Sequence, residues 1–198
     1  MKRVDMESFS NVRRSGLLAI RLKEHDELAW VKSTSGKDTI VLATNGGQAI
    51  HFDETDIRTM GRNAAGVRGI RLKGKDEVVG MDVVSSRSGV AQSQLLVVME
   101  NGFGKRTPVK QYKIQKRGGS GIKTAQVTTK TGPIVLALIV DPENLPEGLK
   151  GDLLIMSNKG QVIRIPLKSI SVLGRATQGV RIMRFKEGGD KVASVTLV

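Results

Sequence analysis

A repeat of 50 to 58 residues runs through this 198-residue chain and constrains its fold more than any other feature. Its clearest marker is an Asn turn, at Asn45-Gly46, Asn101-Gly102 and Asn158-Lys159-Gly160, with the asparagines 56 and 57 residues apart. An aliphatic run precedes each turn and a second short strand pattern follows it, which predicts a β-hairpin. Asn-Gly favours this turn because type I′ geometry needs positive φ at both central residues.

Two further markers recur with the hairpin. The first is a basic turn that closes on a glycine, at positions 16, 66, 121 and 179, and leads into an apolar strand. The second is a nearly continuous apolar run, at 28–31, 78–81, 134–140 and 192–195. Such runs are typical of strands that are covered on both faces. Hairpin-rich units of this length predict an all-β, propeller-like fold of about four four-stranded blades, one sheet per repeat.

The repeats suggest one domain over residues 1–198, divided approximately into 1–35, 36–90, 91–149 and 150–198. The first repeat starts at Met1-Lys2-Arg3, which aligns with Gly104-Lys105-Arg106 and with Val162-Ile163-Arg164. Its first hairpin strand and Asn turn are therefore missing. Because a propeller has to cover its end sheets or expose their edges, we expect further sequence before this point or another form of closure.

The charge balance favours a polyanionic partner. Lys and Arg number 32 against 19 Asp and Glu, which gives a formal net charge of +13. A positive balance that only keeps the protein soluble is the alternative. The cations recur in the basic turns, however, and stacking of the units around an axis would place them along one rim. Aromatic residues are only 3% of the chain, which favours duplex DNA over single strands held by base stacking.

The sequence offers little for catalysis or for a cofactor. It has no cysteine, and its two histidines lie in different repeats without carboxylate partners at metal-ligand spacing. Gly118–Thr124 lacks the spacing of a nucleotide-binding loop, and Tyr112 is expected to be structural. We therefore expect no catalytic residue, no cofactor, no metal and no membrane segment, and a cytoplasmic location.

Several stretches resemble the C-terminal domain family of gyrase A, one of the two proteins of DNA gyrase. They are Gly104–Pro108 with Tyr112, the turn Gln115–Gly121, and the segments 60–72 and 172–181. The hallmark box of that family reads QRRGGKG, and five of its seven positions are identical in Gln115–Gly121. Lys116 is a conservative change, whereas Ser120 replaces a basic residue. The corresponding C-terminal domain of topoisomerase IV is a close relative, but the well-kept box favours gyrase.

The resemblance implies a six-bladed β-pinwheel whose basic rim wraps duplex DNA without strong sequence preference, with this chain as about its last four blades. It also implies partnership with the rest of gyrase A and with gyrase B. Two alternatives stay open, a propeller that binds acidic proteins and a propeller enzyme with a central site. The candidate DNA-binding residues are Arg13, Arg14, Arg62, Arg68, Lys105, Arg106, Lys116, Arg117, Gly118, Gly119, Ser120, Gly121, Lys123, Arg175 and Arg181.

Overall fold

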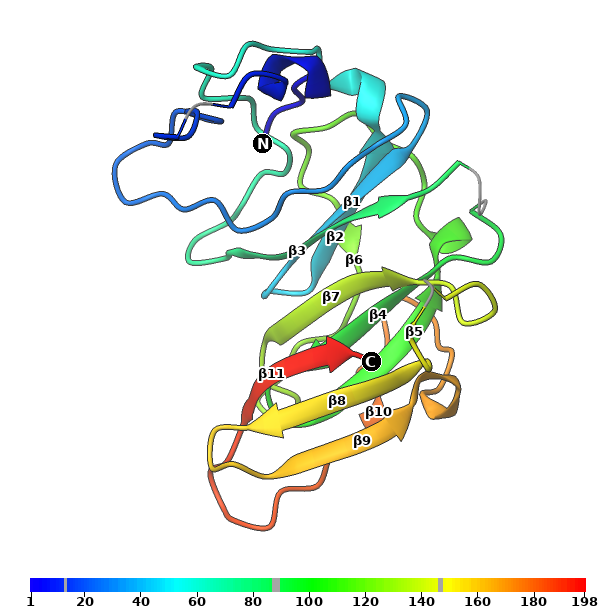
Figure 1. Ribbon diagram of the computed structural model, residues 1–198. Helices are drawn as coiled ribbons and strands as arrows, with labels where there is room; N and C mark the ends of the chain where they lie inside the picture. Colours follow the sequence, from blue (N-terminus) through cyan, green and yellow to red (C-terminus); the bar gives the residue numbers. More distant parts are fainter. Residues whose placement is uncertain (13, 87–89, 146–147) are drawn as a thin grey trace.

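The computed structural model describes residues 1–12, 14–86, 90–145 and 148–198. These residues form three antiparallel sheets that follow one another along the molecule (Figure 1). Each sheet is built on one of the hairpins expected from the Asn turns. The hairpins are β1 (Thr39–Thr44) with β2 (Gln48–Asp53), β4 (Gln94–Met99) with β5 (Phe103–Pro108), and β8 (Asp152–Ser157) with β9 (Val162–Pro166).

A trailing strand completes the inner side of each sheet. β3 (Val78–Val84), β7 (Ile134–Val140) and β11 (Val192–Leu197) each pair with the first strand of their own hairpin. Short 3-10 helices lie beside the sheets: η1 (Met6–Phe9), η2 (Glu54–Asp56), η3 (Val109–Gln111) and η4 (Leu167–Ser169). The last three directly follow the second hairpin strand and lead the chain toward the next basic turn. The fold is therefore all-β and propeller-like.

The repeats exchange their outermost strands. β6 (Ile122–Lys123) lies in the third repeat but pairs with β2, and β10 (Val180–Arg181) lies in the fourth repeat but pairs with β5. The sheet orders are β3-β1-β2-β6, β10-β5-β4-β7 and β11-β8-β9. The expectation of one self-contained sheet per repeat is therefore corrected. In the first two sheets, the fourth strand belongs to the following repeat.

The first repeat differs from the expected pattern. The apolar run 28–31 is not a strand, and the described part of residues 1–35 contributes only an isolated bridge between Arg3 and Thr59. In the other repeats the trailing strand pairs with the first hairpin strand, and no such strand lies beside 28–31 in the described chain. The run is therefore not paired with another strand in the described chain. The described residues form three sheets where four were expected.

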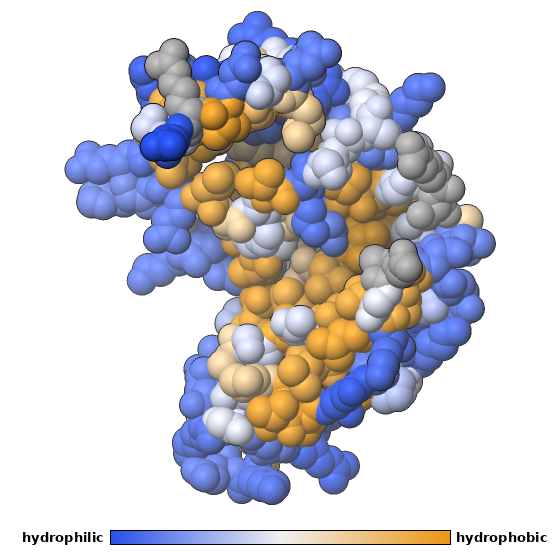
Figure 2. Space-filling view, viewed as in Figure 1, coloured by the Kyte–Doolittle hydropathy of each residue, from blue (hydrophilic) through white to orange (hydrophobic). Residues whose placement is uncertain are grey.

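The core lies between successive sheets because the hairpin strands are apolar on both faces. In β4, Leu95 and Val97 pack toward the first sheet, whereas Leu96 and Val98 pack toward the third. This alternation is the period-2 geometry of a strand, and it explains the unbroken apolar runs. In Figure 2 apolar residues run down the middle of the face shown, with hydrophilic residues around them. Most charged residues therefore lie at the periphery.

The trailing strands lie against one another at the inner side of the sheets. At Gly80 in β3, an added Cβ would be 2.2 Å from the carbonyl oxygen of Ala137 in β7. We expect Gly80→Ala to lower the free energy of unfolding by about 1–3 kcal/mol, because the two strands must separate. Gly61→Ala is the control, since Gly61 has no neighbouring atom within 4 Å. Denaturant unfolding measures both variants, and equal stability would contradict this packing.

Candidate nucleic-acid interface

Three of the four closing glycines lie where one repeat packs on the repeat before it. Gly66, Gly121 and Gly179 have φ values of +90°, +69° and +79°. An added Cβ at these glycines would lie 2.3, 2.5 and 2.7 Å from the carbonyl oxygens of Met1, Ala49 and Gly104, respectively. Only glycine allows this backbone approach without strain. The glycines that close the basic turns at positions 66, 121 and 179 are thus explained by the junctions between repeats.

A basic residue stands two positions after each of these glycines, and all three side chains are exposed: Arg68, Lys123 and Arg181. Lys123 and Arg181 belong to β6 and β10, the outermost strands of their sheets. Val67 in the second repeat makes the equivalent contact with the first repeat, because its N–H donates to the Met1 carbonyl at 2.8 Å. The exchange therefore puts one exposed cation at the same peripheral place in three successive repeats.

Hydrogen bonds join the basic turn of the second repeat to that of the third. The Arg117 guanidinium donates from Nη1 to the Arg68 carbonyl at 3.1 Å and from Nε to the Asp56 carbonyl at 2.8 Å. The N–H of Arg71 donates to the carbonyl of Gly119 at 2.8 Å. The Gly-rich turn 118–121 therefore lies directly against the segment 68–71.

The third and fourth repeats are joined in the same way. Arg175 donates from Nη1 to the Lys123 carbonyl at 3.0 Å, and the N–H of Gln126 donates to the Thr177 carbonyl at 3.1 Å. Arg181 and Lys130 both lie over the ring of Phe103, at 4.9 and 5.6 Å from its centroid. Cation–π contacts of this kind hold charged groups in place at a surface. We call the joined segments 62–71, 115–123 and 175–181 the basic track.

Two of the expected DNA-binding residues are buried, which corrects the prediction for Lys105 and Arg106. The Lys105 ammonium donates to the carbonyls of Gly174, Arg175 and Thr177 at 2.6–3.1 Å, and also to the Thr177 hydroxyl. Arg106 donates to the carbonyls of Ile170 and Lys168 and to the Gln94 amide oxygen. These cations hold the fourth repeat from inside and are not at the surface.

Lys2 repeats the arrangement of Lys105 in the first repeat. Its ammonium donates to the carbonyls of Gly61, Arg62 and Ala64, which belong to the basic turn of the second repeat. Burial lowers the pKa of Lys2, with the charge of Arg62 as a second cause. A lysine at the same position of the repeat, which lies on β5 in the case of Lys105, therefore anchors the following basic turn in two of the three junctions.

The remaining expected residues have varied surroundings. Lys116 is 92% exposed and pairs with Asp56 at 2.8 Å, a contact that raises the pKa of Lys116. Arg14 is exposed, but no hydrogen bond among the described residues ties it to the basic track. Arg13 lies outside the described residues. The half-buried members are Arg62, Arg117, Gly118, Gly119, Ser120, Gly121 and Arg175.

Sequence reasoning missed a second row of basic residues. Arg71 and Arg184 stand five positions after Gly66 and Gly179, and both are exposed. Arg21 has the same spacing from Gly16, whereas Gln126 takes this place after Gly121. Alignment of the repeats on the closing glycine would have found these residues, because the spacing is constant.

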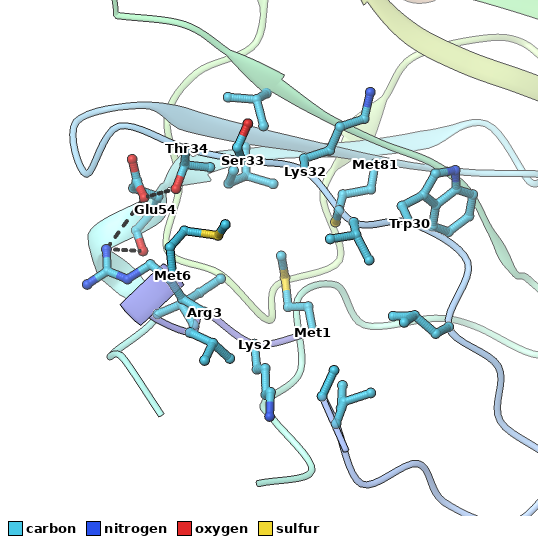
Figure 3. Close-up of a pocket in the computed structure, with 18 of the residues that line it drawn as sticks. Met1, Lys2, Arg3, Met6, Trp30, Lys32, Ser33, Thr34, Glu54 and Met81 are labelled. Atoms are coloured by element: carbon cyan, nitrogen blue, oxygen red, sulfur yellow. Dashed lines mark hydrogen bonds and ion pairs between the residues drawn. The ribbon is translucent and has the colours of Figure 1, made fainter. Parts of the chain in front are cut away.

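An apolar cavity of about 270 Å³ lies between the first repeat, which contributes Met1–Val4 and Trp30, and the first sheet, which contributes Ile40 and Met81 (Figure 3). Its polar groups bind one another: the Glu54 carboxylate pairs with Arg3 at 3.6 Å and accepts the Thr34 hydroxyl at 2.6 Å. Among the described residues, no group of three His, Cys, Asp or Glu could hold a metal ion. The cavity thus offers an apolar lining whose one carboxylate is already engaged.

The buried lysine predicts a dependence of stability on pH. Burial, and then the charge of Arg175, lower the pKa of Lys105 to about 8 from 10.5. Between these values the unfolded chain binds more protons at this site, so the contribution of Lys105 to the free energy of unfolding should rise with pH from about 8 to 10.5. Denaturant titrations of the native chain and of Lys105→Met over this range measure the difference. A difference that is flat or falls with pH would contradict the lowered pKa.

The sheets and the basic track define a propeller-like repeat domain that exchanges edge strands and carries cations on its periphery. A family model described as "DNA gyrase C-terminal domain, beta-propeller" matches residues 1–35, 38–85, 94–141 and 151–198. The chain belongs to this DNA gyrase C-terminal domain family. No helix among the described residues has the length and apolar character needed to cross a membrane.

Comparison with individual proteins agrees with this membership. The chain is 44% identical over 188 residues to gyrase A of Staphylococcus epidermidis, covering 95% of this chain and 20% of that protein. It is 43% identical over 194 residues to gyrase A of Staphylococcus aureus, covering 98% of this chain and again 20% of the relative. The chain thus spans about a fifth of the length of these relatives.

Two solved structures resemble the fold. The C-terminal domain of DNA topoisomerase IV superposes with a TM-score of 0.85 at 24% identity, covering the whole of this chain and 58% of that one. The DNA gyrase A C-terminal domain superposes with a TM-score of 0.72 at 25% identity, covering 92% of this chain and 58% of that one. At 24% identity, the topoisomerase IV likeness supports the fold alone.

Proposed function

We propose that this domain binds duplex DNA along the basic track and bends it, as the C-terminal domain of a gyrase A protein. The observation that carries the proposal is the repeated placement of exposed Arg68, Lys123 and Arg181 two residues after the closing glycine in three successive repeats, with Lys123 and Arg181 on the outermost strands β6 and β10. Hydrogen bonds between the turns keep these cations in one series. The net charge of +13 and the membership of the family support the same function.

The mechanism follows from the geometry of the periphery. Phosphates that bind along the track release condensed counterions, which supplies an affinity that does not depend on sequence. DNA that follows a curved series of cations must bend, at a cost of a few kcal/mol that the phosphate contacts have to offset. The Gly-rich turn 118–121 is half-buried, and without large side chains its backbone lets a phosphate oxygen approach closely.

Within the whole enzyme, the bent duplex would be guided to the DNA-cleaving core so that strand passage proceeds in one direction. The domain itself would supply no catalytic group and no cofactor. Its partners would be the remainder of gyrase A and the gyrase B protein, acting on the chromosome in the cytoplasm. These roles rest on the family, since the chain covers a fifth of its relatives.

A salt series tests the proposal. We expect fluorescence anisotropy with a linear duplex to show binding whose logarithm falls linearly with the logarithm of salt, with a slope that indicates about 6–10 phosphate contacts. A duplex labelled at both ends should show its ends drawn together on binding. Absent or salt-independent binding would refute the proposal. Equal competition by an acidic polypeptide would favour a module that binds acidic proteins.

A further inference from the structure

The second row of residues, five positions after each closing glycine, occupies one fixed place in the junctions between repeats. Its members are Arg21, Arg71, Gln126 and Arg184. At three successive junctions the backbone N–H of this residue donates to the carbonyl two positions before the next closing glycine. These bonds run from Arg21 to Ala64 at 3.4 Å, from Arg71 to Gly119 at 2.8 Å and from Gln126 to Thr177 at 3.1 Å. The positions are therefore structurally equivalent.

The side chains of the second row are exposed even where a further repeat follows. Arg71 and Gln126 are exposed although the basic turn of the next repeat lies against their backbone. The exposure therefore belongs to the position itself, because the following repeat does not cover it. No carboxylate among the described residues forms an ion pair with Arg71 or Arg184. Both charges are thus available to an anionic ligand.

A short and constant length of chain separates the second row from the first row, which is Arg68, Lys123 and Arg181. Arg68 stands three residues before Arg71, and Lys123 stands three residues before Gln126. The two residues between them are buried in both repeats. Three residues of fully extended chain span at most about 11 Å. The two rows therefore run side by side along the periphery, within about that distance of each other.

Two parallel rows of cations match a ligand that presents two parallel rows of phosphates. In duplex DNA the two backbones run along either side of the minor groove, which is about 6 Å wide. A single strand presents only one row of phosphates. Its bases would have to bind by stacking, and aromatic residues are only 3% of this chain. A duplex can therefore occupy both rows, whereas a single strand can occupy one.

We propose that the second row contacts one strand of duplex DNA while the first row contacts the other, so that the second row sets the preference for duplex over single strands. The inference rests on the DNA binding proposed above and assigns a role to residues outside the first row. Gln126 is a gap in the second row, because it is uncharged where the repeats on either side carry Arg71 and Arg184. The third repeat therefore lacks one contact to the second strand.

Gln126→Arg fills the gap and tests the second row by a gain of binding. We expect the affinity for a labelled duplex to rise about threefold at moderate salt, whereas the affinity for one of its strands should stay within about twofold. The slope of log affinity against log salt should steepen by about one for the duplex. Gln111→Arg is the matched control, since Gln111 is exposed in η3 and lies outside both rows. Fluorescence anisotropy measures all of these affinities.

Arg71→Ala and Arg68→Ala compare the two rows by a loss of binding. Each variant removes one exposed arginine, and Arg71→Ala keeps the backbone N–H that binds Gly119. Arg71→Ala should weaken duplex binding about fivefold and single-strand binding by less than about twofold. Arg68→Ala should weaken both by about fivefold, because a single strand follows the first row.

Equal losses of duplex and single-strand binding in Arg71→Ala would overturn the inference. So would a gain from Gln126→Arg that is no larger than the gain from Gln111→Arg. A native chain that binds no duplex would refute the proposed function as well, which keeps the two failures apart. Circular dichroism shows whether each variant is folded. If Arg71→Ala proves unfolded, the comparison of Gln126→Arg with Gln111→Arg decides the matter by itself.

Discussion

Replacement of Arg68, Lys123 and Arg181 together by alanine should lower the affinity for duplex DNA about 100-fold at moderate salt. Each side chain is exposed two residues after a closing glycine, and loss of one phosphate contact is expected to cost about 1 kcal/mol. The slope of log affinity against log salt should also fall by about three, because each phosphate contact contributes about one. Anisotropy titrations at several salt concentrations measure both quantities.

The control for this variant removes three charges elsewhere. Lys37, Lys150 and Lys186 are exposed and lie outside the basic track, and their replacement by alanine leaves the same net charge as the first variant. For this control we expect the slope of log affinity against log salt to stay within about one unit of the native slope. If both variants lose affinity equally, the total charge of the domain and not its placement governs binding.

The hairpins and the all-β fold could be predicted from the sequence because their causes are local. An Asn turn between two apolar runs specifies a hairpin through the φ values that its residues allow. The exchange of strands could not be predicted in this way. β6 and β10 contain two residues each, and what fixes them is the approach of Gly121 and Gly179 to distant carbonyls. Their sequences show only a glycine followed by an apolar and a basic residue.

The candidate site was predicted in part for a similar reason. Composition and repetition place basic residues in equivalent turns, and the exposed Arg68, Lys123 and Arg181 follow from that repetition. Lys105 and Arg106 have the same chemistry but lie inside, because the carbonyls of the next repeat satisfy their donors. A basic residue on a short strand such as β5 has no local feature that reveals such a distant partner.

The junctions also differ in what supports each basic turn. Lys2 and Lys105 hold the turns of the second and fourth repeats from inside through their ammonium groups. In the third repeat the turn 115–121 has an apolar side chain below it, since the Cδ1 of Ile50 is 3.7 Å from a Cβ built on Gly119. Its support comes from Arg117 instead, which donates to the second repeat. Cations therefore serve both the interior and the surface of this domain.

Lys105→Met should show how far the interior lysine positions the surface charge. Methionine fills a similar volume but removes the hydrogen bonds that the Lys105 ammonium donates to three carbonyls and one hydroxyl. We expect a loss of about 3 kcal/mol in the free energy of unfolding at pH 7, because hydrogen bonds to a charged group are lost. The affinity for duplex DNA should fall about tenfold as the Arg175 turn loosens. Denaturant unfolding and anisotropy measure the two effects.

Lys110→Met separates this anchoring from the simple loss of one charge. Lys110 is exposed in η3, and its replacement removes the same charge without touching the fourth repeat. We expect the stability of this variant to stay within about 0.5 kcal/mol of the native value. If Lys105→Met were as stable as Lys110→Met, water would have to replace the ammonium group at little cost. The buried lysine would then be dispensable for holding Arg175 on the basic track.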